Sequence, residues 1–113
     1  MPFIDNKISV PVSEEKKTII KNALGEYVAT LGKSEQWLMV GIDDNYELWF
    51  AGEKMDKGAY VSVALFGSAA SDSYDRLTAQ ICGLYQDVLG IPADKVYVSY
   101  HPVHDWGWNG GNF

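Results

Sequence analysis

The chain has 113 residues, of which 47% are hydrophobic, and its formal net charge is −6. This length suits one domain, so we expect residues 1–113 to fold as a single unit. The acidic balance argues against a nucleic acid or an anionic membrane as partner, because both attract basic surfaces. The single cysteine, Cys82, excludes a disulfide within the chain and a Cys-x-x-Cys centre.

The N-terminal segment does not have the pattern of a signal peptide. Residues 1–20 contain no apolar core of sufficient length, and residues 14–17 are all charged. No stretch approaches the roughly 20 apolar residues of a membrane span. We therefore expect a cytoplasmic protein, with release from cells without a signal peptide as the alternative.

The first half of the chain predicts a strand, a helix and two further strands. Residues 2–8 form a short, partly apolar segment typical of a strand. Ser13 suits a helix N-cap, and the helix is predicted to end at Gly32. Two runs rich in large apolar residues, 37–42 and 46–50, are predicted strands. The helix carries an apolar stripe at helical spacing: Ile19, Ile20, Ala23, Leu24, Tyr27, Val28 and Leu31.

The second half repeats this order. Residues 59–66 predict a strand that Gly67 ends, a helix follows from Ser71 to Gly90, and residues 95–100 predict another strand. The second helix has its own apolar stripe: Tyr74, Leu77, Ile81, Leu84, Tyr85 and Val88.

The two halves align at an offset of 58 residues, which matches Gly32 with Gly90 and Val40 with Val98. We interpret residues 1–57 and 58–113 as two copies of an ancestral unit. The alternative is that any two strand–helix–strand units look alike.

Two such units with right-handed crossovers place two helices on one face of a four-stranded sheet. Side-chain alternation gives this sheet an aliphatic face for the helices to cover. The offset pairs Pro2 with Tyr60, which assigns Pro2 to the opposite, open face. That open face is part aromatic and part small or polar: Trp37, Met39, Gly41, Tyr60, Ser62, Ala64, Phe66, Tyr97, Ser99 and His101.

An uncovered, half-apolar sheet face needs a partner, and another copy of the chain is the simplest one. The chain also contains four Trp and seven Tyr, a large aromatic area for a body of this size. We therefore expect a homo-oligomer whose subunits bring their open faces together.

Five segments resemble the macrophage migration inhibitory factor family of the tautomerase superfamily. They are MPFI at the start, LGK at 31–33, LFG at 65–67, GIPADKVYVSY at 90–100 and GWNGGNF at 107–113. The resemblance covers the whole chain. It implies an α+β sandwich of two βαβ repeats, with a four-stranded mixed sheet and two helices on one face. It also implies a homotrimer with active sites at the subunit interfaces.

The resemblance implies roles for four residues around the reacting groups. The catalytic base of the family is the amino-terminal proline, which corresponds to Pro2 after removal of Met1. Lys33 corresponds to the lysine that binds the substrate carboxylate. Phe66 corresponds to the strand-end residue whose backbone helps to hold the substrate, and Tyr97 corresponds to a tyrosine from a neighbouring subunit.

The resemblance also implies which residues line the pocket. Ser99 takes a position that is commonly asparagine, and Trp37 corresponds to a lining aromatic residue. At the carboxyl end, Trp106, Trp108 and Phe113 correspond to pocket residues, and the closing segment is expected to lie across a neighbouring subunit.

The chain departs from the family pattern in two respects. Gly58 and Val61 stand where the cytokine has Cys-x-x-Cys, which excludes a thiol-oxidoreductase activity based on that motif. Phe66 and Trp106 are bulkier than the usual isoleucine and valine, so we expect a narrower pocket.

These residue types suit keto–enol tautomerisation of an aromatic 2-oxo acid such as phenylpyruvate. A single base can remove and return the proton, and such a base works best with a pKa near the ambient pH. Burial and the cation of Lys33 both lower the pKa of an amine at Pro2. Pro2 acts as a base only if Met1 is cleaved, because an acylated nitrogen has no basic lone pair.

The sequence is also compatible with other functions. The main alternative is a cytokine-like signalling or binding protein with a vestigial pocket and a protein receptor. A weaker one is another reaction of the superfamily, such as hydration or dehalogenation. His101 and His104 lack further ligands at suitable spacing, so no metal or cofactor is expected.

Overall fold

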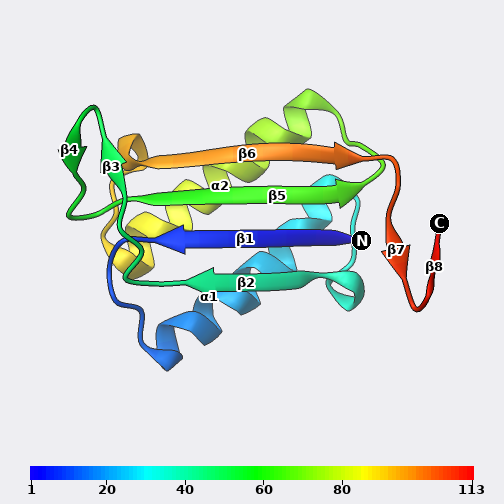
Figure 1. Ribbon diagram of the computed structural model, residues 1–113, viewed down its shortest axis with the longest axis horizontal. Coiled ribbons are helices and arrows are strands. Elements are labelled where there is room, and N and C mark those ends of the chain that lie inside the picture. The colour runs from blue at the N-terminus through cyan, green and yellow to red at the C-terminus, as the bar shows by residue number, and fades with distance from the viewer.

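The computed structural model describes residues 1–113 and contains one four-stranded sheet with the strand order β2-β1-β5-β6 (Figure 1). The strands are β1 (Pro2–Ile8), β2 (Met39–Asp43), β5 (Ala59–Phe66) and β6 (Val96–Val103). β1 pairs with β2 in parallel, β5 pairs with β6 in parallel, and β1 and β5 are antiparallel at the centre. This mixed sheet confirms the predicted α+β fold.

Two helices, α1 (Glu14–Tyr27) and α2 (Ser71–Leu89), lie on one face of the sheet (Figure 1). The Ser13 side chain accepts a hydrogen bond from the Lys16 N–H at 3.2 Å, which confirms the predicted N-cap of α1. A 3₁₀ turn, η1 (Val28–Leu31), continues α1. Neither helix has the length and apolar character needed to cross a membrane.

The core lies between the helices and the aliphatic face of the sheet. Val61, Val63 and Leu65 of β5 are fully buried against residues of both helices. The predicted stripes supply most of the helical part, except that Ile19 is 44% exposed. Ile19 lies 100° around the helix from the buried Ile20, which places it at the solvent-facing edge of the stripe. The stripe residues that are buried are Ile20, Leu24, Val28, Leu31, Leu77, Ile81, Leu84 and Tyr85.

One polar side chain is fully buried in this core. Asn6 of β1 donates to the Gly41 carbonyl at 2.9 Å and to the Ile4 carbonyl at 3.3 Å, and its side-chain oxygen accepts from the Tyr85 hydroxyl. Burial raises the pKa of Tyr85 far above its ordinary value, so its phenol stays protonated as a donor. The pair links the sheet to α2 and leaves no buried side-chain polar atom unpaired.

The structure corrects the placement of Pro2. In β1 the buried positions are Pro2, Ile4, Asn6 and Ile8, so Pro2 points to the helices and Phe3 begins the open face. The halves correspond at an offset of 57 in their first strands: Ile4 pairs with Val40, and the counterpart of Val40, Val98, pairs with Val61.

The offset becomes 58 only after the helices, because α1 and η1 together contain one residue fewer than α2. A slip of one residue moves a strand side chain to the other face of the sheet, which explains the error.

The edges of several predicted strands also differ. Residues 35–37 form a 3₁₀ turn, η2 (Glu35–Trp37), because the Ser34 hydroxyl accepts from the Gln36 N–H at 3.2 Å. Trp37 therefore precedes the sheet instead of belonging to it. A further turn, η3 (Ala93–Lys95), replaces the start of the predicted strand 95–100.

The predicted strand 46–50 is largely wrong. Tyr46 instead donates a single backbone hydrogen bond to the Ile8 carbonyl at 3.0 Å. Only β3 (Trp49–Phe50) is a strand, and it forms a hairpin with β4 (Glu53–Lys54). A second hairpin, β7 (Gly107–Trp108) with β8 (Gly111–Asn112), closes the chain.

We predict that Tyr85→Phe lowers the free energy of unfolding by about 1–3 kcal/mol, because it leaves the buried Asn6 oxygen without a donor. Chemical denaturation at matched protein concentration measures this change. Tyr46→Phe is the control, because Tyr46 is 40% exposed and its hydroxyl makes no hydrogen bond within the chain. Equal stability of the two variants would contradict the role of the Asn6–Tyr85 pair.

Candidate active site

The candidate site lies at the amino terminus, where the backbone of Phe66 forms hydrogen bonds with both Met1 and Lys33. The Phe66 N–H donates to the Met1 carbonyl at 3.0 Å, and the Phe66 carbonyl accepts from the Lys33 ammonium at 2.9 Å. Phe66 is the last residue of β5, which pairs with β1 so that Pro2 lies opposite Leu65. The end of β5 therefore holds Lys33 beside the Met1–Pro2 junction.

Lys33 reaches this edge because of how the first helix ends. Gly32 follows η1 with a φ of 72°, and its N–H donates to the Ala29 carbonyl at 2.9 Å. The Lys33 N–H donates to the Val28 carbonyl at 3.3 Å, so the backbone of Lys33 is fixed to the helix. The long side chain then crosses from the helix layer to the end of the sheet.

Aromatic rings from the carboxyl-terminal hairpin stand next to these groups. The amino terminus and the β7–β8 hairpin lie at the same end of the molecule (Figure 1). Trp108 meets Trp37 edge-on at a centroid distance of 5.1 Å and stacks on Phe113 at 6.3 Å. Phe113 also contacts Phe66 at 5.5 Å. Aromatic pairs at these distances are attractive, so they hold the hairpin against the end of the sheet.

A cavity of about 350 Å³ opens between the amino terminus and this hairpin. Its volume is within the range of about 300–1,000 Å³ that small-molecule sites occupy. Its lining is mainly apolar and includes Pro2, Trp37, Trp106 and Trp108 of the predicted site. The complete lining is Met1, Pro2, Phe3, Gln36, Trp37, Leu38, Met39, Trp106, Gly107 and Trp108.

The environment of the amino terminus disfavours positive charge. Burial, and then the cation of Lys33, lower the pKa of the Met1 amino group. The nitrogen of Pro2 lies three bonds away from this amino group, and Pro2 itself is buried. An amine at Pro2 would therefore meet the same two effects.

Two predicted site residues lie elsewhere in the chain. Tyr97 is 63% exposed and contacts Phe50, at the opposite end of the sheet from Pro2. Their strand positions differ by five residues along β5, which corresponds to about 17 Å. Ser99 lies on the open face, where its hydroxyl hydrogen bonds with the Tyr60 hydroxyl at 2.7 Å and with His101 Nε2 at 2.8 Å. Neither residue reaches the Pro2 of its own chain.

Six residues that line the cavity were not among the predicted site residues: Met1, Phe3, Gln36, Leu38, Met39 and Gly107. Strand alternation already assigned Met39 to the open face, so the sequence pattern indicated that its side chain is available to a site there. Phe3 was hidden by the incorrect assignment of Pro2 to that face. No sequence pattern indicates that Gln36 lines the cavity, because its position there depends on the η2 turn. Phe66 does not line the cavity in this chain, since its ring packs against Phe113.

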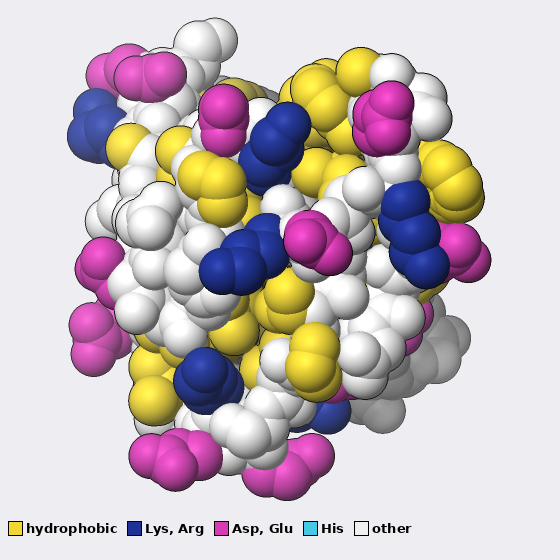
Figure 2. Space-filling model, turned by 90° about the vertical axis from the view of Figure 1, so that its left-hand side faces the viewer, with side chains coloured by type: hydrophobic (Ala, Val, Ile, Leu, Met, Phe, Trp, Pro, Cys, Tyr) yellow, Lys and Arg dark blue, Asp and Glu magenta, His cyan; other side chains and the backbone are white.

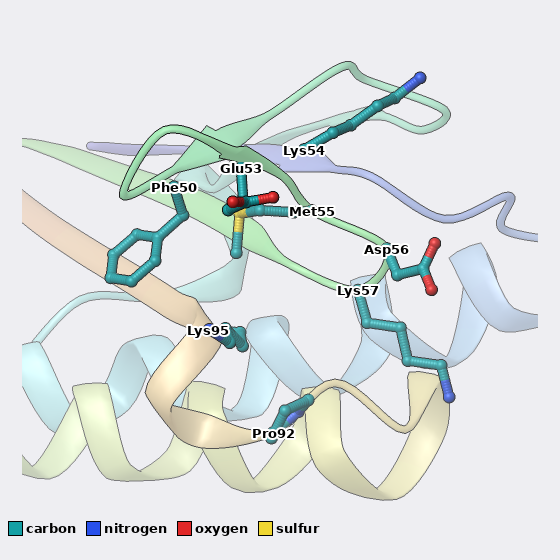
Figure 3. Close-up of a pocket in the computed structure, with 8 residues that line it drawn as sticks. All are labelled: Phe50, Glu53, Lys54, Met55, Asp56, Lys57, Pro92 and Lys95. Atoms are coloured by element: carbon teal, nitrogen blue, oxygen red, sulfur yellow. The ribbon is translucent and has the colours of Figure 1, made fainter.

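A second cavity, of about 310 Å³, contains none of the predicted site residues. It lies between the β3–β4 hairpin, which contributes Phe50, and the turn before β6, which contributes Pro92 and Lys95 (Figure 3). Lysine, acidic and hydrophobic side chains are interspersed over this end of the molecule (Figure 2). Because this cavity has both acidic and lysine side chains in its lining, its charge does not indicate a particular class of ligand.

We predict that Lys33→Met raises the pKa of the Met1 amino group part of the way to its ordinary value, because burial persists when the cation is removed. NMR titration of protein expressed under inhibition of methionine aminopeptidase measures this shift. Lys7→Met is the control and should leave this pKa unchanged. It removes the same charge about 17 Å away along β1, beyond the screening length of about 8 Å at physiological salt. A pKa that Lys33→Met leaves unchanged would refute the electrostatic coupling.

Comparisons with known proteins match this chain over its whole length. The profile of the macrophage migration inhibitory factor (MIF) family matches residues 1–113. The macrophage migration inhibitory factor of Meriones unguiculatus is 27% identical, with 100% of this chain and 99% of the relative covered.

Two solved structures share the architecture. Leishmania major MIF2 has a TM-score of 0.92 and 32% identity, with 100% of this chain and 97% of that chain covered. A MIF homologue from Prochlorococcus marinus has a TM-score of 0.88 and 27% identity, with 98% of each chain covered. The chain therefore belongs to the macrophage migration inhibitory factor family of the tautomerase superfamily.

Proposed function

We propose that the protein is a keto–enol tautomerase of aromatic 2-oxo acids such as phenylpyruvate, with Pro2 as the general base. The observation that carries this proposal is the geometry at the Met1–Pro2 junction. There, Phe66 binds the Met1 carbonyl through its N–H and the Lys33 ammonium through its carbonyl. The acyl group on the proline nitrogen thus accepts a hydrogen bond from the same residue that holds the Lys33 cation.

Removal of Met1 would convert this junction into a reaction site. The Pro2 nitrogen would gain a basic lone pair, and the Phe66 N–H would lose its acceptor. A freed N–H beside the base can bind an oxygen of the substrate, and such donors stabilise developing negative charge. Met1 therefore occupies the space that the substrate would take.

The remaining groups supply the steps of the reaction. An ammonium has three donors, so Lys33 can keep its bond to Phe66 and still bind the substrate carboxylate. The Pro2 amine takes a proton from the carbon beside the carbonyl, and the electron pair of that C–H bond forms the C=C bond. The carbonyl oxygen becomes an enolate, which accepts a hydrogen bond from the Phe66 N–H and then takes the proton held by the Pro2 ammonium, so the free amine is restored. Trp37 and Trp108 provide apolar walls for the ring of the substrate.

We also propose that the working form is a homotrimer in which a neighbour completes each site. Tyr97 and Ser99 lie on or beside the open face, far from the Pro2 of their own chain. Met39, Tyr60 and Tyr97 leave large apolar surfaces exposed on that face. Packing against other copies would bury this area and bring Tyr97 to the site of the next subunit.

A cytokine-like role is the second candidate. It is favoured by the curated relatives that match the whole chain, which are named macrophage migration inhibitory factor. Both candidates use the same fold. Binding to a protein receptor that persists in Pro2→Gly, together with no activity on 2-oxo acids in the Met1-free protein, would favour the cytokine-like role.

The first test is turnover of phenylpyruvate by Met1-free protein, whose N-terminus mass spectrometry verifies. We expect Pro2→Gly, which still permits removal of Met1, to lower kcat/KM about 100-fold, because positioned general bases contribute about 10²–10⁴-fold. We expect the protein with retained Met1 to be inactive, since its proline nitrogen is an amide. Full activity with Met1 retained would contradict a role for the Pro2 amine.

The second test asks whether neighbouring subunits share a site. Pro2→Gly and Tyr97→Ala subunits are each expected to have low activity. When they are unfolded together and refolded at a 1:1 ratio, about a third of the sites in each mixed trimer, and about a quarter of all sites, should combine an intact Pro2 with an intact Tyr97. Recovery of activity to about this fraction supports the shared site, and no recovery in verified mixed trimers contradicts it.

A further inference from the structure

The peptide unit between Phe66 and Gly67 is held on both sides. Its carbonyl accepts from the Lys33 ammonium at 2.9 Å, and its N–H, which belongs to Gly67, donates to the Val103 carbonyl at 3.0 Å. Phe66 also donates its own N–H to the Met1 carbonyl. The orientation of this one peptide plane therefore sets where the Lys33 ammonium lies relative to the amino terminus.

Gly67 lets the chain turn away without rotating that plane. Its φ is +80°, in the left-handed region that L residues with a Cβ rarely adopt. Beyond the turn, the Ala69 N–H donates to the Tyr74 hydroxyl at 3.0 Å, and Tyr74 stacks on Tyr100 with a centroid distance of 4.5 Å. The chain is thus anchored both before and after Gly67.

An added side chain at position 67 would not collide with anything. No heavy atom outside its chain neighbours lies within 4 Å of a Cβ built there. A substitution therefore acts through the backbone angle alone. To reach a negative φ, a residue with a Cβ at position 67 would have to rotate about its N–Cα bond, which turns the Phe66–Gly67 peptide against the two hydrogen bonds that hold it.

We propose that Gly67 is a positioning residue for the tautomerase site: its left-handed backbone directs the Phe66 carbonyl at Lys33 and so holds the ammonium beside the N-terminal nitrogen. This inference rests on the proposed function. Gly67 touches no reacting atom, and it acts through the carbonyl of the residue before it. A rotated peptide would release Lys33 from the place where it meets the substrate carboxylate and the amine of Pro2.

The test compares Met1-free Gly67→Ala with Gly67→Asn and with the control Gly90→Ala. Gly90 has a φ of +67° at the opposite end of α2 from Gly67, and the nearest atom to a Cβ there is Lys57 Nζ at an ordinary 3.7 Å. Both alanine variants therefore carry a similar local strain. Asparagine tolerates the left-handed region better than alanine, so it should keep the peptide in place.

We expect Gly67→Ala to raise KM for phenylpyruvate about tenfold, which corresponds to about 1.4 kcal/mol of lost binding. The acid limb of its kcat/KM profile should move to higher pH, because a more distant cation lowers the pKa of the Pro2 amine less. Gly67→Asn should restore most of the wild-type KM and most of the wild-type pH profile. Gly90→Ala should change only the melting temperature.

Gly67→Ala that behaves like Gly90→Ala in both readouts would overturn the inference. An equal loss in Gly67→Asn and Gly67→Ala would also overturn it, because the backbone angle would then not be the cause. If the wild-type protein turns over no 2-oxo acid, the proposed function fails. NMR titration of the Pro2 amine then still decides whether Gly67 positions Lys33, since that readout needs no substrate.

Discussion

The arrangement of the candidate site depends on the two hydrogen bonds that Phe66 makes at the end of β5. One bond, to the Met1 carbonyl, fixes the start of β1, and the other, from Lys33, fixes a cation beside it. Without the second bond the lysine would be a mobile surface side chain, and its charge would be screened by solvent. The same residue thus joins the two groups that the proposed chemistry needs, Pro2 as the proposed base and Lys33 as the proposed carboxylate-binding cation.

The fold explains why these groups meet at one edge. The central antiparallel pair puts the first residue of β1 opposite the last residues of β5, and Gly32 directs Lys33 to the same end from the helix layer. The β7–β8 hairpin then covers this edge with Trp108 and Phe113. Elements from the beginning, the middle and the end of the chain are all required, so the site forms only when the domain folds.

Much of this could be predicted from the sequence. Helical stripes and strand alternation are local patterns, and they correctly predicted the aliphatic face, both helices and the exposure of Met39. Pro2 was assigned to the wrong face of the sheet because the helix of the first half is one residue shorter than that of the second. The offset of 58 comes from the glycines after the helices, and it does not show that the strands before the helices correspond at 57. The bond between Lys33 and Phe66 depends on tertiary packing, for which residue spacing gives no signal.

The most direct measurement of the central claim is an NMR titration of the Pro2 amine in the assembled, Met1-free protein. Burial and the adjacent Lys33 should hold the pKa of this amine below that of a proline amine at the end of an unfolded peptide of the same sequence. Lys33→Met should raise it. A Pro2 amine that titrates like the peptide, with or without Lys33, would contradict the account.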